Sequence, residues 1–157
     1  MTLKKHERIL AELKTIISNP HPGSNRFRTV ADLIKCSGDY RWVGLYRVDH
    51  ALGLVTNVAW SGPGPPKYPM FPIARGLTGA AISMGATINV GDVTADPRYL
   101  TAFATTRSEI IVPFFDRQAE RVIGTIDVES REPNAFGEEE QNLLELCAGV
   151  IRPLWEA

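Results

Sequence analysis

The sequence predicts an α+β fold in which helices flank a mainly antiparallel sheet. Apolar residues recur with helical periodicity near both ends of the chain, and two pairs of β-rich runs lie between them, each joined by a short polar turn. The 157 residues contain no repeat, no low-complexity tract and no interdomain linker. We therefore expect a single domain over residues 1–157.

Two helices are expected at the start of the chain, within residues 3–37. The first, over residues 3–17, has an amphipathic pattern made by Leu3, His6, Ile9, Leu10, Leu13, Ile16 and Ile17. The proline-rich segment 19–23 ends it, and a second apolar pattern runs from Phe27 to Ile34 before Ser37-Gly38 ends that helix.

The sheet and a pocket are expected within residues 40–130. Runs 41–49 and 53–60 predict one hairpin, and runs 108–115 and 121–129 predict a second pair around a polar turn at 116–120. Prolines and glycines at 62–66 predict a loop, because proline lacks an amide donor.

Three further helix signals complete the pattern. Gly76 to Met84 predicts a short helix ended by Gly85, and Asp96-Pro97 predicts another helix start with Asp96 as its cap. The last helix, within residues 137–157, opens with three glutamates at the positive end of its dipole.

Composition excludes some partners and sets an expected location. The net charge of -1 gives no reason to expect binding to nucleic acid or to an anionic membrane. No apolar run approaches about 18 residues and no apolar segment follows the first lysines, so we expect a cytoplasmic protein. Cys36 and Cys147 both lie in apolar helical patterns, which predicts that both pack in the interior.

Five segments together resemble a GAF domain. They are residues 88–93, 96–99, 107–113 and 122–130, and Phe136 at the start of a helix. The resemblance implies a profilin- and PAS-like fold: a six-stranded antiparallel sheet, with terminal helices on one face and a ligand pocket on the other.

Within that superfamily the chain is most similar to the free methionine-(R)-sulfoxide reductases. Trp42 and Tyr46 match their tryptophan and tyrosine, and Glu109 matches their strand-opening glutamate. Asp127-Val128-Glu129 matches an Asp-x-Asp pattern with glutamate as its second acid. The resemblance implies that these positions bind substrate.

The reactive cysteines of that family are not matched. The resemblance places them at Tyr68, Thr78 and Ala102. Attack on a sulfoxide needs a thiolate, which tyrosine, threonine and alanine cannot supply. We therefore expect no catalytic residue here and no reductase activity.

The retained residues favour an amine or an amino-acid-like zwitterion as ligand. Asp127 and Glu129, two residues apart on a strand, share a face, and Glu109 can add a third carboxylate whose repulsion a bound cation would relieve. Aromatic faces can bind a cation, and amides near Thr78 can bind a carboxylate. The expected ligand-binding set is Trp42, Tyr46, Thr78, Glu109, Asp127 and Glu129.

Other interpretations of these residues remain open. Glu109 could accept hydrogen bonds from the backbone of residues 92–96, the two acids of the third strand could be solvated strand ends, and the aromatic pair could be ordinary core. No metal is expected, because Asp92, Asp96 and Asp127 have no converging histidine. No cofactor is expected either: a bilin needs a pocket cysteine, and the cyclic-nucleotide patterns of the superfamily are not reproduced.

The sequence thus predicts a free-standing, non-catalytic sensor or effector-binding module in signal transduction. An enzyme with altered chemistry in the reductase pocket is the alternative, and an interaction module with a vestigial pocket is a third possibility. We expect no output domain beyond Ala157, so a signal would pass to a partner or through self-association. Broad apolar stripes on the terminal helices, with the resemblance, predict a homodimer through them.

Overall fold

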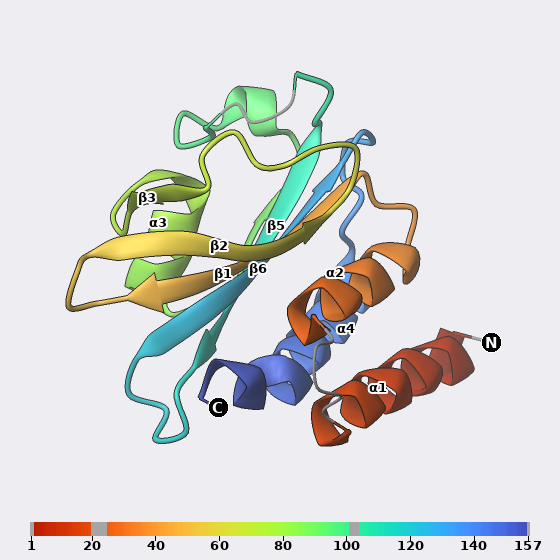
Figure 1. Ribbon diagram of the computed structural model, residues 1–157. Helices are drawn as coiled ribbons and strands as arrows, with labels where there is room; N and C mark the ends of the chain where they lie inside the picture. The colour runs from red at the N-terminus through yellow and green to blue at the C-terminus, as the bar shows by residue number, and fades with distance from the viewer. Residues whose placement is uncertain (1, 20–24, 101–103, 157) are drawn as a thin grey trace.

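The computed structural model describes residues 2–19, 25–100 and 104–156 (Figure 1). Along the chain these residues form α1 (Thr2–Ser18), α2 (Arg26–Cys36), β1 (Trp42–Asp49), β2 (Leu54–Ser61), β3 (Met70–Pro72), α3 (Gly76–Met84), β4 (Ile88–Val90), the 3-10 helix η1 (Val93–Ala95), β5 (Ser108–Phe115), β6 (Val122–Ser130), α4 (Glu138–Ile151) and the 3-10 helix η2 (Arg152–Trp155). The predicted α+β class is confirmed.

The six strands form one antiparallel sheet in the order β3-β2-β1-β6-β5-β4. The four long strands are those that the alternating runs predict, and both expected hairpins are present. Strands β3 and β4 at the edges have only three residues each, too few for an alternating pattern to reveal them. The first and last long strands, β1 and β6, pair in the centre and position the site described below.

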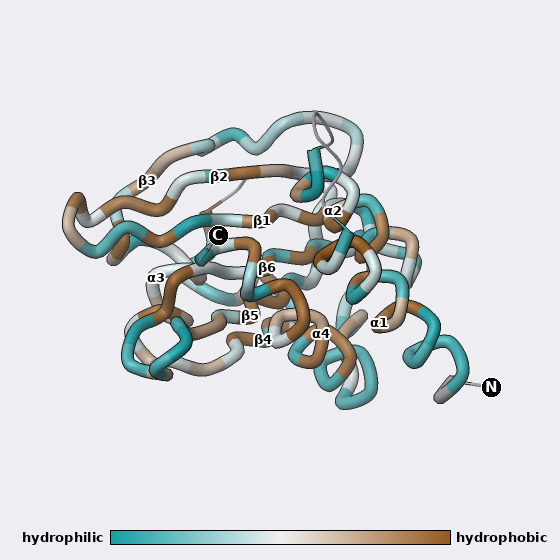
Figure 2. Tube along the Cα trace, turned by 60° about the horizontal axis from the view of Figure 1, so that its bottom comes forward, coloured by the Kyte–Doolittle hydropathy of each residue, from teal (hydrophilic) through white to brown (hydrophobic). Residues whose placement is uncertain are grey.

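The terminal helices cover one face of the sheet and α3 lies on the other (Figure 1). The main core lies between the sheet and α1, α2 and α4, where Leu13, Ile34, Leu45, Leu144 and Ile151 are fully buried. Figure 2 shows the same division, with apolar segments of the strands and α4 meeting inside and polar colours on the outer turns and the start of α1. This arrangement leaves the opposite face of the central strands free to form a pocket.

Helix ends follow their local chemistry in most places. The Asn25 side chain caps α2 by accepting from the Arg28 amide. Gly85 ends α3 with a φ of 61°, in the left-handed region that favours glycine, as predicted. The expected helix start at Asp96 is wrong: Asp92 caps the short η1 through Thr94, and Asp96 lies at its end.

The predicted burial of both cysteines is wrong for one of them. Cys147 lies in the main core, whereas Cys36 is exposed at the end of α2. Cys36 is two residues beyond the buried Ile34, so it projects about 200° further around the helix, away from the sheet.

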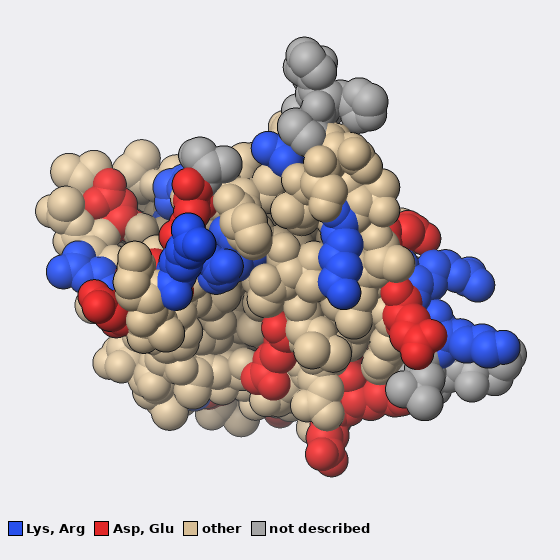
Figure 3. Space-filling view, turned by 90° about the horizontal axis from the view of Figure 1, so that it is seen from below, with Lys and Arg blue, Asp and Glu red and all other residues tan. Residues whose placement is uncertain are grey.

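Charges of both signs are spread over the surface. On the face seen from below in Figure 3, lysine and arginine side chains are interspersed with aspartate and glutamate. Within the described ranges, no helix has both the length and the apolar character needed to cross a membrane.

Candidate ligand-binding site

Strand β1 presents its aromatic residues to the face opposite the terminal helices. Val43 and Leu45 pack into the helix-side core, while Trp42 and Tyr46 belong to a separate apolar cluster on the other face. Gly44 lies between the two aromatic residues, and a Cβ at this position would stand 2.3 Å from the Trp42 ring. The glycine therefore lets the aromatic rings lie close over the strand.

Strands β5 and β6 place three carboxyl groups on that same face. Glu109 pairs with Glu129 across the two strands, and Asp127 pairs with Gly44 of β1. One oxygen from each of the three carboxyls lies within 4.8 Å of the other two. The parity expected along each strand is therefore correct, and the three acids converge.

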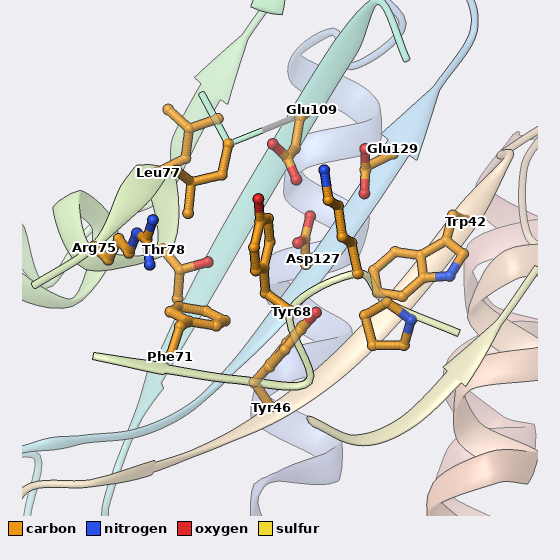
Figure 4. A pocket seen from close by; sticks show the side chains of 13 residues that line it. Trp42, Tyr46, Tyr68, Phe71, Arg75, Leu77, Thr78, Glu109, Asp127 and Glu129 are labelled. Carbon is orange, nitrogen blue, oxygen red and sulfur yellow. The ribbon is translucent and has the colours of Figure 1, made fainter. Parts of the chain in front are cut away.

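These residues line a small cavity of about 50 Å³ (Figure 4). All six residues of the expected ligand-binding set contribute to its wall. The loop before β3, β3 itself, α3 and the segment after η1 supply the rest: Pro66, Lys67, Tyr68, Phe71, Arg75, Leu77 and Leu100. The cavity has room for a few water molecules, since one water needs roughly 10–15 Å³ of such space.

Two of the alternative interpretations are wrong. Glu109, Asp127 and Glu129 are 6%, 7% and 1% exposed, so none is a solvated strand end. The amides of residues 93–96 donate to other groups, namely Arg107 O, Asp92 Oδ1, Asp92 O and Val93 O, and so do not hold Glu109.

Burial dominates the electrostatics of the acid cluster. It raises the pKa of Asp127 to about 6 and that of Glu129 to about 8, with the charge of Asp127 adding to the second shift. The pKa of Glu109 is raised well above its ordinary value, first by burial and then by both neighbouring acids. A hydrogen bond with Glu109 opposes the shift of Asp127. Asp127 therefore ionises before Glu129, and burial favours the protonated form of Glu109.

Glu129 and Asp127 differ in their hydrogen-bond partners. Glu129 Oε1 accepts a hydrogen bond of 2.7 Å from the buried hydroxyl of Thr106. Asp127 Oδ1 is buried and has no hydrogen-bond partner among the described residues. A buried acceptor without a donor costs about 1–3 kcal/mol, and more when it is charged. The cavity thus contains one unsatisfied, negatively charged oxygen.

Aromatic rings form the wall below the acids. Tyr46 and Phe71 meet edge to face with ring centroids 5.7 Å apart. The Trp42 indole nitrogen donates to the carbonyl of Gly64 at 3.0 Å, which ties the ring to the loop after β2. Burial and the three nearby acids keep the pKa of Tyr46 well above its ordinary value, so its hydroxyl stays protonated.

Two cations border the cavity, Lys67 in the loop before β3 and Arg75 at the start of α3. Lys67 Nζ and the Arg75 guanidinium lie 5.5 Å and 5.7 Å from the centre of the Tyr68 ring. Arg75 is also the N-cap residue of α3 without a capping side-chain bond, and Figure 4 shows it beside Thr78 across the cavity from Trp42. The sequence analysis missed both cations, although a charge directly before the Gly76-Leu77-Thr78-Gly79 turn could have indicated one.

No cysteine is found among the described residues that line the cavity. Two of the positions at which the resemblance places cysteines, Tyr68 and Thr78, are in the wall, and the third, Ala102, lies outside the described residues. The two cysteines of the chain lie on α2 and α4, which cover the other face of the sheet.

Comparison with known proteins settles the family. A model of the GAF domain matches residues 24–152. The chain belongs to the GAF domain family. Its sequence is 26% identical over 141 residues to GAF domain-containing protein A of Dictyostelium discoideum, covering 90% of this chain and 86% of that protein. Fold, family and sheet topology together support a small-molecule-binding module.

The expected similarity to the free methionine-R-sulfoxide reductases is confirmed. The Saccharomyces cerevisiae enzyme is 28% identical over 113 residues, which cover 72% of this GAF domain and 62% of the enzyme. The structure of the Neisseria meningitidis enzyme in complex with its substrate superposes with a TM-score of 0.85 at 27% identity, covering 96% of this chain and 88% of that one.

Proposed function

We propose that this GAF domain is a cytoplasmic, non-catalytic sensor module that binds an amine or an amino-acid-like zwitterion. The observation that carries the proposal is the Oδ1 atom of Asp127, which is buried, charged near neutral pH and without a hydrogen-bond partner among the described residues. An ammonium group placed there would donate the missing hydrogen bond and neutralise the charge.

The rest of the cavity fits one positive charge. The raised pKa values of Glu109 and Glu129 favour their protonated forms and so favour a cluster with a single negative charge, which one ammonium group balances. The rings of Trp42 and Tyr46 line the same cavity. A cation bound close to an aromatic face is stabilised by about 0.5–2 kcal/mol.

The α3 side of the cavity suits a carboxylate. Arg75 lines the wall, and the first turn of the nine-residue α3 points its amides toward this end without a capping side chain. A zwitterion spanning the two ends would therefore meet charges of the opposite sign at both. Because the cavity holds only about 50 Å³, such a ligand would have to displace the loop residues Pro66, Lys67 and Tyr68 from the wall.

The alternative function is an enzyme with altered chemistry in a reductase-like pocket. The similarity to the Neisseria meningitidis structure favours it. Thiol chemistry is not supported, because Tyr68 and Thr78 have no sulfur and neither cysteine reaches the cavity. Free methionine-(R)-sulfoxide incubated with the protein and a thioredoxin system tests this point directly. Turnover above that of the heat-inactivated protein would overturn the non-catalytic assignment.

A ligand screen by thermal denaturation tests the proposed function. A ligand that binds only the folded state raises the melting temperature by mass action. We expect amino acids or small amines to do so and expect Asp127→Asn to weaken the best of them by about 2–5 kcal/mol. Glu120→Gln, an equal change of charge at an exposed turn residue, should leave affinity unchanged.

Two other results of the screen would replace the proposal. A shift caused by Mn²⁺, Mg²⁺ or Ca²⁺ but by no amine would indicate that the three carboxylates hold a metal ion, which their spacing permits. A blank screen would favour an interaction module with a vestigial pocket.

We also infer that the module signals as a homodimer formed through its terminal helices. Leu146 on α4 is 54% exposed, and Leu10, Ile16 and Ile17 on α1 are only partly buried. Sedimentation at tens of micromolar should show a dimer, which Leu146→Lys should dissociate. Met84→Lys is the matched control, because Met84 is as exposed but lies on α3. A strict monomer would remove this inference.

A further inference from the structure

A second hollow, of about 530 Å³, lies where β1 begins and β2 and β6 end, beside α2. Four cationic side chains line it, together with two carboxylates: Arg28, Lys35, Arg41 and Arg131, with Asp39 and Glu132. The chain as a whole has 17 basic and 18 acidic residues, so the excess of positive charge in the hollow is local.

The four cations come from three separate segments. Arg28 and Lys35 are seven residues apart on α2 and so share one face of the helix, Arg41 precedes β1, and Arg131 follows β6. The Arg28 guanidinium lies 5.2 Å from the centre of the Trp60 ring. Arg28 also forms an ion pair with Asp32, and both side chains are about half exposed. Such an exposed pair is weak, so it hinders binding of Arg28 to another anion only slightly.

Three buried residues with hydroxyl groups also line this cationic hollow. They are Tyr40, Ser61 and Ser130, which are 8%, 7% and 2% exposed. Guanidinium groups bind phosphate oxygens through paired hydrogen bonds, and hydroxyls can donate to the same oxygens. The volume lies in the range of about 300–1,000 Å³ that is usual for small-molecule sites.

From these observations we propose that the cationic hollow is a second binding site, for a small molecule that carries a phosphate or pyrophosphate group. The proposal does not depend on the ligand of the acid-lined cavity, which is a different site with the opposite charge. Asp39 and Glu132, which also line the hollow, oppose an anion, but the four cations outnumber them.

The two sites share a wall. Ser61, Gly62 and Pro63 line the cationic hollow, the next residue, Gly64, accepts the indole hydrogen bond of Trp42, and Pro66 to Tyr68 line the acid-lined cavity. Arg41 connects them as well, because its charge lowers the pKa of Glu129 and its amide donates to the Glu129 carbonyl at 2.9 Å. Occupancy of one site would therefore alter the other, and the coupling must be reciprocal.

Calorimetric titration of the full chain with inorganic pyrophosphate, at constant ionic strength, tests the site. We expect saturable binding of one pyrophosphate per chain. Arg131→Gln and Lys35→Gln should each weaken it about tenfold, the usual effect of losing one charge-assisted hydrogen bond. Arg117→Gln, an equal change of charge in the exposed β5–β6 turn, should change it less than twofold.

Absence of saturable binding, or equal weakening by all three variants, would overturn the proposed site. The indole N–H resonance of Trp42, followed by NMR during the same titration, tests the coupling. A shift that saturates with the calorimetric signal is expected, and Arg131→Gln should need about tenfold more pyrophosphate to reach the same shift. A Trp42 resonance that stays fixed while pyrophosphate binds would overturn the coupling between the two sites.

Discussion

The two faces of the sheet are built from the same strands but have opposite chemistry. Toward the terminal helices the central strands present Val43, Leu45, Ile126 and Val128, all fully buried among apolar neighbours. Toward α3 the alternate residues of the same strands include aromatic rings and two carboxyls, and Glu109 of β5 adds a third. Burial of apolar side chains on the first face stabilises the fold. Burial of the acids on the second face destabilises it, as is common at binding sites.

The largest difference between the faces should appear in the free energy of unfolding. Leu144 of α4 is fully buried against the helix side of the sheet. Leu144→Ala should cost about 3–5 kcal/mol, because it loses apolar burial and leaves a cavity. Urea denaturation measures this loss. The affinity of the folded protein for a ligand of the acid-lined cavity should not change. A loss below about 1 kcal/mol would mean that α4 adds little to the core.

The acid-lined face should make stability fall as pH rises. Glu129 has a raised pKa of about 8 in the folded protein, so its contribution is complete below the pKa of the unfolded chain and is lost as pH rises through 8. Glu129 alone should lower the free energy of unfolding by roughly 2 kcal/mol between pH 6 and pH 8, and Glu109 should add to the drop. Urea denaturation at several pH values measures the slope.

Matched variants locate the origin of that slope. Glu129→Gln cannot ionise, so the part of the slope that Glu129 supplies should disappear, while Glu109, whose pKa is also raised, retains its own part. Leu144→Ala should lower stability equally at both pH values. If Glu129→Gln retains the full slope, the titrating group lies elsewhere and the charge assignment of the cluster is wrong.

Removing the charge of Asp127 should have a smaller effect and should increase the stability of the fold. Asp127 is ionised near neutral pH and buried between two other acids. Asp127→Asn should therefore raise the unliganded stability by about 1 kcal/mol at pH 7, although it weakens the proposed ligand. Melting temperatures in the absence of ligand measure the effect. A lower melting temperature would show that the carboxylate stabilises the fold rather than straining it.

Elements with long periodic patterns were predictable from the sequence, and elements held by their neighbours were not. The terminal helices and four long strands carry their own signals, and strand parity places Trp42 with Tyr46 and Asp127 with Glu129. Strands β3 and β4 exist because β2 and β5 offer them hydrogen-bonding edges. The mistaken helix start at Asp96 has a local cause: Asp92, three residues before the end of η1, already caps that turn through Thr94.

The candidate site divides in the same way. The acids and aromatic residues sit on regular strands, so their direction follows from counting residues. Lys67, Tyr68 and Arg75 come from loops and a helix cap, whose side-chain directions depend on tertiary contacts that no local pattern encodes. The resemblance to the reductases supplied the link between strands that are distant in sequence, which periodicity alone does not give.

The two cysteines offer the smallest and most direct comparison, because both lie on helices of the same face. Cys147 is fully buried in the core, and burial raises its pKa to about 12, whereas Cys36 is exposed at the end of α2. An aromatic disulfide reagent should therefore modify one thiol in the folded protein and both in urea. Cys36→Ser should abolish the native reaction and change the free energy of unfolding by less than about 0.5 kcal/mol, as expected for an exposed position. Reaction of the folded Cys36→Ser protein at a wild-type rate would show that α4 opens and exposes Cys147, so the helix-side face would be less firmly packed than its burial indicates.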